Sequence, residues 1–329
     1  MEAAETAGVW ARGTGLTASD IRVDRTRAGP EALGYGMLAS DGAQLTVRGG
    51  AITASAAVGI VVVGGGADLD SVAVRGNVGG GIRLEGARVE ARGLVLDGNT
   101  GFGLGLVRST GTIQGVTVRD TLEALGGGGG DGLVVTGGAE PGAPDLQIGG
   151  CLLTGNHRLG SLMDGVGGVR LTDTDFTRNG GGGLWIQGRA TDETVIENSR
   201  FTENDLVGVA VVQAGPLTIQ GNRIEGTIGA DLADARGVGD GISVYDTAVD
   251  VVDNRVADNA RLGLILGAAR GRLTDNEIDQ DVTAVVLQGG SDQALVVTGT
   301  TFTGLAMEIE VRGPGDDLPI ARERLEGRP

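Results

Sequence analysis

The sequence lacks lysine altogether, and it has one cysteine and eight aromatic residues among its 329 positions. The single Cys151 cannot form an internal disulfide bond, and its place beside Leu152 and Leu153 predicts a buried thiol. No apolar run approaches the roughly 20 residues of a transmembrane helix, so we expect no membrane insertion. The N-terminus also lacks the basic and then apolar pattern of a signal peptide.

Basic residues are also fewer than acidic residues. The 26 arginines stand against 43 Asp and Glu residues, which gives a formal net charge of −17. This charge argues against binding to nucleic acid or to anionic membranes. The hydrophobic share of 40 % is too high for a disordered chain, and the 64 glycines follow no Gly-X-Y period, which excludes collagen. What is left is a folded, Gly-rich protein with few rings to fill its core.

One unit recurs along nearly the whole chain. It reads apolar, two residues, a small polar residue that is usually Asn, three residues, Gly, and then apolar–x–apolar. Asn77 to Asn99 spans 22 residues and Asn179 to Asn204 spans 25. The polar position is occupied by Ser55, Asn77, Asn99, Asn156, Asn179, Asn204, Asn259 and Asp281.

This period, with its short alternating runs of Val, Ile and Leu, predicts strands and not helices. Each repeat holds about three strands, and repeats of this kind stack at about 4.8 Å into a parallel β-helix. We therefore expect an all-β solenoid of about 12 coils, with 22–25 residues in each. It would cover residues 16–311, with a lead or cap at 1–15 and a polar tail or linker at 312–329.

The same fold accounts for the composition. A narrow interior lined by Val, Ile, Leu and Ala has little room for rings. Corners that require a positive φ select Gly or Asn, so we expect the Gly and Asn of the repeat to lie at such corners. The Asn column is interpreted as structural, with each amide satisfying backbone groups at a bend.

The frame N-x-x-x-G-apolar-x-apolar, as in Asn77…Gly81-Ile82-Arg83-Leu84, resembles the right-handed parallel β-helix repeats of the pectate-lyase-like superfamily. That superfamily includes polysaccharide lyases, glycoside hydrolases, uronate epimerases, phage tailspikes and non-catalytic surface proteins. The chain looks most like Gly- and Arg-rich repeat arrays in secreted or surface proteins of high-GC bacteria. The resemblance implies the fold and is nearly silent about activity.

Three coils depart from the frame in the same way. Thr26, Thr121 and Thr227 replace the Asn, and the spacer before the next Gly is expanded. These coils are the first, fifth and ninth, so the loops would project from one edge about 19 Å apart. Duplication of a four-coil block explains this regularity, and a contact strip built from the loops is the alternative. Two of the loops close with Gly-Asp-Gly at Asp131 and Asp240, which we interpret as turn residues.

One row of charges is a candidate binding site. The residues before the apolar anchor in successive coils are Asp175, Arg200, Arg223, Arg255 and Glu277. An outward arginine stack of this kind can bind the carboxylates of an acidic polysaccharide, or the charges can neutralise one another as a solvated ladder. Trp185 and Tyr245, and also Tyr35, are the rings that could provide an aromatic platform beside it.

No catalytic residue or resident cofactor emerges from the sequence. His157 is the single histidine and has no Cys or His partner nearby, so we expect no metal ligation there. The Gly126–Gly130 run lacks the lysine of a phosphate-binding loop. Calcium stays possible because Asp and backbone oxygens are abundant, although the nonapeptide calcium repeat is absent.

The ends offer little cap material. Val9 and Trp10 precede the first coil, where Trp10 could plug the interior, and a polar tail follows Arg312. Thin caps favour an excised segment of a longer extracellular or surface protein, for which a missing signal peptide is expected.

The leading functional hypothesis is a non-catalytic structural or binding module with glycans or other proteins as ligands. A polysaccharide-active enzyme (lyase, epimerase or hydrolase) acting on acidic glycans is the first alternative. A unit that assembles by end-to-end stacking of its terminal coils is the second.

Overall fold

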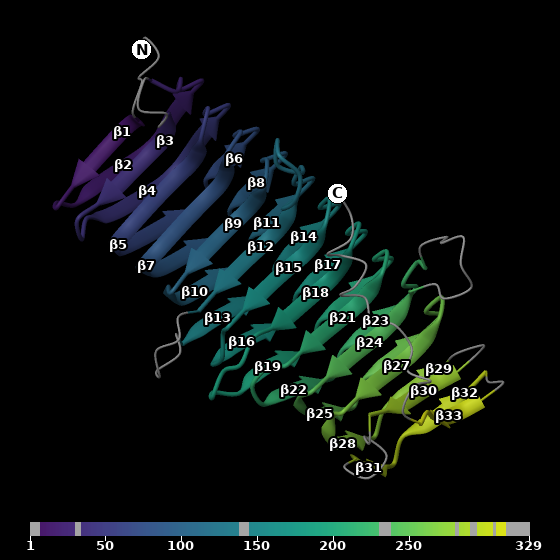
Figure 1. Ribbon diagram of the computed structural model, residues 1–329. Coiled ribbons are helices and arrows are strands. Elements are labelled where there is room, and N and C mark those ends of the chain that lie inside the picture. The colour runs from purple at the N-terminus through teal and green to yellow at the C-terminus, as the bar shows by residue number, and fades with distance from the viewer. Residues whose placement is uncertain are drawn as a thin grey trace. The chain divides into compact units, whose positions relative to one another are not determined.

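The computed structural model describes residues 7–29, 34–137, 145–229, 238–279, 283–289, 295–304 and 307–313. Every regular element within these ranges is a β-strand (Figure 1). The contacts divide the chain into two compact units, the first ending at Leu162 and the second beginning at Met163. Each unit contains three parallel sheets, here called A, B and C, and each coil contributes to all three in turn. The predicted all-β parallel solenoid is confirmed.

In the first unit, sheet A contains β1 (Ala7–Arg12), β3 (Tyr35–Ser40), the first part of β5 (Val58–Asp70) and of β7 (Gly80–Arg92), β9 (Phe102–Val107) and β12 (Asp131–Thr136). Sheet B contains the first part of β2 (Leu16–Asp24) and of β4 (Gln44–Thr53), the ends of β5 and β7, β10 (Thr110–Gln114) and β13 (Leu146–Gly149). Sheet C contains the ends of β2 and β4, β6 (Ala73–Arg75), β8 (Val95–Asp97), β11 (Thr117–Arg119) and β14 (Leu152–Thr154). The strand β15 (Leu159–Asp164) contains the boundary between the units.

In the second unit, sheet A contains β18 (Gly182–Gln187), β21 (Val207–Val212), β24 (Asp240–Tyr245), β27 (Leu262–Gly267), β30 (Thr283–Gln288) and β33 (Met307–Val311). Sheet B contains β16 (Val169–Thr172), β19 (Thr194–Glu197), β22 (Leu217–Gln220), β25 (Ala248–Val252), β28 (Arg270–Thr274) and β31 (Leu295–Thr298). Sheet C contains β17 (Asp175–Thr177), β20 (Arg200–Thr202), β23 (Arg223–Glu225), β26 (Arg255–Ala257), β29 (Glu277–Asp279) and β32 (Thr301–Thr303).

The buried side chains are mostly aliphatic, and in the second unit they include a stacked pair of rings. Leu, Ile and Val fill most of the fully buried positions. Phe176 and Phe201 occupy the same register position in successive coils, and their rings stack with centroids 4.6 Å apart. A ring is thus accommodated where the next coil places a second ring directly against it.

The Gly and Asn of the repeat are not at left-handed positions, which corrects the expectation from sequence. Gly208 and Asn204 both lie outside the set of residues with positive φ. A Cβ on Gly208 would lie 2.6 Å from the carbonyl oxygen of Gly241 in the next coil. The repeat glycine is required because two backbones approach closely there, and the left-handed corners are elsewhere in the coil.

The asparagine column forms a hydrogen-bonded ladder between sheets C and A. In the first unit, the backbone N–H and the side-chain amide of Asn77 both donate to Oδ1 of Asn99, at 3.1 and 2.8 Å. In the second unit, Asn179 donates to Oδ1 of Asn204 in the same way, at 3.1 and 2.9 Å. The amide of Asn204 donates to the carbonyl oxygen of Phe176. Asn156 and Asn259 accept from the backbone of Thr121 and Thr227, which begin the expanded loops.

A second ladder, between sheets B and C of the second unit, was missed from sequence. Asn222, Asn254 and Asn276 are buried, and the Oδ1 of each accepts the backbone N–H of the equivalent residue in the preceding coil, at 2.9–3.0 Å. In the first unit the equivalent positions hold the buried apolar residues Val72, Leu94 and Val116. Cys151 is buried, as predicted, and its thiol lies 3.3 Å from the carbonyl oxygen of Gly149.

The first coil begins earlier than the sequence indicated. Within the stretch predicted as a lead at residues 1–15, β1 pairs in parallel register with β3. Trp10 lies in this strand with 54 % of its surface exposed, and it therefore does not plug the interior.

Candidate functional site

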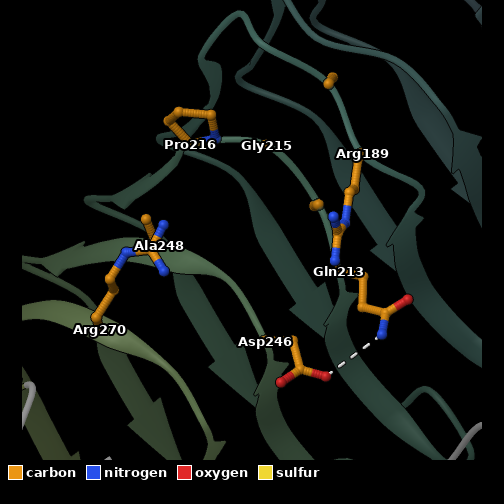
Figure 2. Close-up of a pocket in the computed structure, with 9 residues that line it drawn as sticks. Arg189, Gln213, Gly215, Pro216, Asp246, Ala248 and Arg270 are labelled. Atoms are coloured by element: carbon orange, nitrogen blue, oxygen red, sulfur yellow. Dashed lines mark hydrogen bonds between the residues drawn. The ribbon is translucent and has the colours of Figure 1, made fainter. Parts of the chain in front are cut away.

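A pocket of about 370 Å³ lies in the second unit at the corner between sheets A and B (Figure 2). It arises because this corner changes length from coil to coil. Residues 165–168, 188–193 and 213–216 form corners of four, six and four residues, whereas residues 246–247 and 268–269 form corners of two. The three long corners build a wall, and the shorter ones leave a step beside it. The pocket is lined by Arg189, Ala190, Gln213, Ala214, Gly215, Pro216, Asp246, Ala248 and Arg270.

The wall is held by hydrogen bonds between successive corners. The backbone N–H of Gly168 donates to the carbonyl oxygen of Glu193, and that of Thr194 donates to the carbonyl oxygen of Pro216. The N–H of Ala214 donates to Oγ1 of Thr247 at 3.1 Å. A Cβ on Gly215 would lie 2.5 Å from the carbonyl oxygen of Ala190. The pocket is therefore a preformed feature of the coil stack.

Two polar side chains of the pocket leave the chain at left-handed corner positions. Gln213 has a φ of 51° and Asp246 a φ of 50°. Their backbone N–H groups donate to the carbonyl oxygens of Tyr245 and Gly267 in the next coil, both at 2.9 Å. The Gln213 amide lies 3.5 Å from Oδ2 of Asp246 (Figure 2). The corner geometry thus places an amide and a carboxylate next to each other along one edge of the pocket.

Arg189 and Arg270 lie on opposite sides of the pocket (Figure 2). Both side chains are exposed, and neither forms an ion pair with any residue in the described part of the chain. Their guanidinium groups keep their hydrogen-bond donors for a ligand. In a chain with a net charge of −17, two such cations around one hollow form a local anion-binding arrangement.

The arginine row predicted from sequence differs from the pocket, because two of its arginines are paired with carboxylates on the same sheet. Asp175, Arg200, Arg223, Arg255 and Glu277 are in register on sheet C, as the repeat predicted. Arg223 Nε lies 2.5 Å from Glu225, and Arg255 pairs with Glu225 and Glu277. The hydrogen bond that Arg255 donates to Glu277 raises the pKa of Arg255. Arg223, Arg255 and Glu277 are therefore neutralised by ion pairs on their own sheet. Asp175 and Arg200 form no ion pair among the described residues.

The aromatic candidates do not lie on this row. Trp185 is on β18 and Tyr245 on β24, both in sheet A. Trp185 is only 4 % exposed and donates from Nε1 to Gln187, so the expectation of an exposed stacking platform is wrong for this residue. Tyr245 is half-buried and packs against a cluster of Leu262, Ile265 and Val286. Tyr35 is the first residue of β3 in the first unit.

Asp131 and Asp240 are more than the turn residues expected from sequence. Each is the first residue of a sheet A strand, is buried, and accepts two hydrogen bonds from an arginine in the following coil. The partner of Asp131 is Arg158, whose pKa is raised by the hydrogen bond, and the partner of Asp240 is Arg261. In the other two expanded loops, residues 31–33 and 234–237 lie outside the described residues, as does Asp281 of the polar column.

Among the described residues, no group of three or more His, Cys, Asp and Glu side chains is arranged to hold a metal ion. His157 lies 3.6 Å from Glu123, at the expanded loop after Thr121. No helix in the described ranges has the length and hydropathy needed to cross a membrane.

The pocket itself was missed from sequence. The feature of the sequence that indicates the pocket is the number of residues between the sheet A strand and the sheet B strand of each coil. The segments Gly188–Glu193 and Gln213–Pro216 lengthen a corner that elsewhere takes two residues. The expanded loops lie at a different corner, the one between sheets C and A.

Comparison with known proteins bears on the fold. Tailspike protein 2 of Escherichia coli O157:H7 bacteriophage CAB120 is similar, with a TM-score of 0.54 and 12 % identity, over 73 % of this chain and 37 % of that one. The Dettilon tailspike protein has a TM-score of 0.53 and 11 % identity, over 91 % of this chain and 61 % of that one. This chain thus spans 37 % and 61 % of the two tailspike chains.

The A-module of mannuronan C-5 epimerase AlgE4 from Azotobacter vinelandii is matched with a TM-score of 0.49 and 16 % identity, over 95 % of this chain and 91 % of that one. At these identities the similarity to the tailspikes shows a shared fold and nothing about activity. The similarity to the epimerase is too low to support a conclusion. No curated protein sequence matches the chain.

The family model described as "Right handed beta helix region" matches residues 131–304, which is more than half of the chain. The parallel sheets, the stacked coils and the asparagine ladders agree with that description. The chain therefore belongs to the right-handed β-helix family.

Proposed function

We propose that this protein is a non-catalytic β-helical binding module that holds an acidic glycan in the pocket between Arg189 and Arg270. The observation that carries the proposal is the preformed hollow flanked by two arginines that have no ion-pair partner among the described residues. Guanidinium groups bind carboxylates and sulfates with two parallel hydrogen bonds, which gives both affinity and orientation.

The remaining lining residues suit a sugar. Gln213 and Asp246 offer a donor and an acceptor for hydroxyl groups along one edge. Ala190, Ala214, Pro216 and Ala248 provide small apolar surfaces against which the faces of a sugar ring can pack. Small-molecule sites commonly combine an apolar lining with a few placed polar groups.

The family context is compatible with this ligand class. The pectate-lyase-like superfamily, which the repeat resembles, contains polysaccharide-active enzymes as well as non-catalytic surface proteins. An acidic glycan is met mostly outside the cell, so the proposal includes a secreted or surface location.

Binding is favoured over glycoside hydrolysis because of the number of carboxylates in the pocket. Glycoside hydrolysis generally uses two carboxyl groups about 5–10 Å apart. Asp246 is the one carboxylate among the residues that line the pocket. An orienting acceptor is the role that a single carboxylate fills.

The test is calorimetric titration of the protein with short uronate oligosaccharides. Arg189→Ala and Arg270→Ala should each weaken the affinity about tenfold, which corresponds to the loss of one charge-assisted contact. Arg88→Ala is the matched control, because Arg88 is an exposed arginine of the first unit that is far from the pocket in sequence and does not line it. It should leave the affinity unchanged.

Two outcomes would overturn the proposal. If Arg200→Ala abolishes binding while Arg189→Ala has no effect, the ligand binds the row on sheet C instead. If unsaturated or shortened products accumulate when the protein is incubated with the oligosaccharides, the protein is an enzyme.

A further inference from the structure

We infer that the pocket selects a glycan whose anionic groups are separated by an uncharged sugar. This inference rests on the proposed function and adds the charge pattern of the ligand. Its basis is the order in which the pocket presents charge along the coil stack: cation, carboxylate, cation.

That order follows from the strand connections. Arg189 belongs to the corner after β18, Gln213 to the corner after β21, and Asp246 to the corner after β24. Arg270 is the first residue of β28, which follows β27. Each step is one coil, so the backbones that carry the two arginines are three coils, or about 14 Å, apart. Asp246 lies between them, one coil from Arg270.

The backbone that carries the central carboxylate is held by the coil stack. The left-handed φ of Asp246 and the hydrogen bond from its N–H to Gly267 set the direction in which its side chain leaves the corner. The amide of Gln213 approaches it from the neighbouring coil. The corner therefore sets the point at which the Asp246 side chain leaves the backbone, next to the amide of Gln213.

Asp246 also leaves both cations available. It forms no ion pair with Arg189 or Arg270, and among the described residues its carboxylate is hydrogen-bonded to the amide of Gln213. The pocket is thus not neutralised from within, unlike the row on sheet C, where Glu225 and Glu277 pair with the arginines.

A ligand that lies along the stack meets these charges in sequence. An anionic group at each end pairs with a guanidinium group. A group in the middle faces the acceptor-only oxygens of Asp246, which favour a hydroxyl donor and repel a carboxylate. A volume of about 370 Å³ is in the lower part of the range for sites that hold a compact organic ligand, which suits a short stretch of sugar chain.

The experiment compares two trisaccharides by calorimetry at low salt. One probe is uronate–neutral hexose–uronate, and the other is a tri-uronate. We expect the alternating probe to bind about tenfold more tightly to the unaltered protein. Asp246→Asn should remove most of this preference, mainly by strengthening the binding of the tri-uronate, because asparagine tolerates the left-handed corner and keeps an acceptor oxygen.

Asp253→Asn is the matched control. Asp253 is also an exposed aspartate at a left-handed corner of the second unit, with a φ of 54°, but it does not line the pocket. It should leave the preference unchanged, which separates the local effect of Asp246 from the general effect of removing one negative charge.

The outcomes distinguish failure of the ligand's charge pattern from failure of the binding site. If the tri-uronate binds as tightly as the alternating probe, while Arg189→Ala and Arg270→Ala still weaken both, the charge pattern is wrong and the binding site stands. If neither arginine substitution affects either probe, the proposed function fails, and this inference fails with it.

Discussion

Asp240 and Arg261 form a two-point ion pair in the interior of the second unit. Nε of Arg261 lies 2.7 Å from Oδ1 of Asp240, and Nη2 lies 2.5 Å from Oδ2. The carboxylate is fully buried, and 14 % of the arginine side chain is exposed. Asp131 and Arg158 repeat the arrangement in the first unit at 2.8 and 2.5 Å. In both cases the aspartate follows an expanded loop, so the pair fixes the end of that loop to the next coil.

Removing the carboxylate charge should destabilise the second unit. Asp240→Asn removes the charge that pairs with the largely buried Arg261, and removing one partner of a buried ion pair costs about 3–5 kcal/mol. Asp131→Asn should cost less, because 32 % of the Arg158 side chain is exposed to water. Urea denaturation of the two variants, with the exposed Asp253→Asn as the control, gives the comparison. Equal losses for Asp240→Asn and Asp253→Asn would mean that the buried pair is energetically unimportant.

The second ladder should be essential to the second unit. Asn254 accepts from the backbone and the amide of Asn222 and donates to the carbonyl oxygen of Ile219. Asn254→Ala leaves several buried polar groups without partners, and we expect a loss of at least about 2 kcal/mol in the free energy of unfolding. Gln220→Ala, which removes an exposed amide on β22, should change it by less than about 0.5 kcal/mol. A loss of that small size for Asn254→Ala would contradict the ladder's role.

The close approach at the repeat glycine predicts a position-specific steric effect. Gly208→Ala places a Cβ 2.6 Å from the carbonyl oxygen of Gly241 and 2.5 Å from a methyl group of Ile224. We expect a loss of about 1–3 kcal/mol, as for an overpacked core. Gly126→Ala is the control, because a Cβ there meets no atom within 4 Å and Gly126 does not have a positive φ. Thermal melts that rank the two variants in the opposite order would contradict this account of the repeat.

The buried thiol predicts a pH dependence. Desolvation raises the pKa of Cys151 above its ordinary value of 9.0. The folded protein therefore keeps the thiol proton at a pH where the unfolded chain loses it, so stability should fall as pH rises through about 9. Cys151→Ala should not show this component of the fall. Labelling with a thiol reagent at pH 9 should be slow in buffer and fast in denaturant, and equal rates would show that the thiol is accessible in the folded state.

The sequence was sufficient to predict the solenoid, because the spacing of Asn, Gly and aliphatic pairs is repeated in nearly every coil. The second ladder escaped notice because its positions hold Val72, Leu94 and Val116 in the first unit and asparagines only in the second. The pattern therefore does not recur along the whole chain. The role predicted for the repeat glycine was also wrong. A close contact with the next coil and a left-handed φ both require glycine, so the sequence does not distinguish them.

The candidate site was harder to predict than the fold. Register on sheet C followed directly from the repeat, but the ion pairs that neutralise Arg223 and Arg255 depend on side-chain rotamers. The alternation of side chains along the strand indicated that Trp185 points away from the interior, but it did not indicate that this side chain is buried. The pocket depends on differences in length between neighbouring corners, and these differences are departures from the repeat and not part of its pattern.

The expanded loop after Thr121 has a consequence for engineering. Asp131 and Arg158 fix its end to the next coil, while Leu125 within it is 91 % exposed and Gly126 has open space around it. The loop is thus closed at its base independently of what its tip contains. A foreign peptide inserted beside Gly126 would be displayed from a rigid stack without burdening the coils that support it.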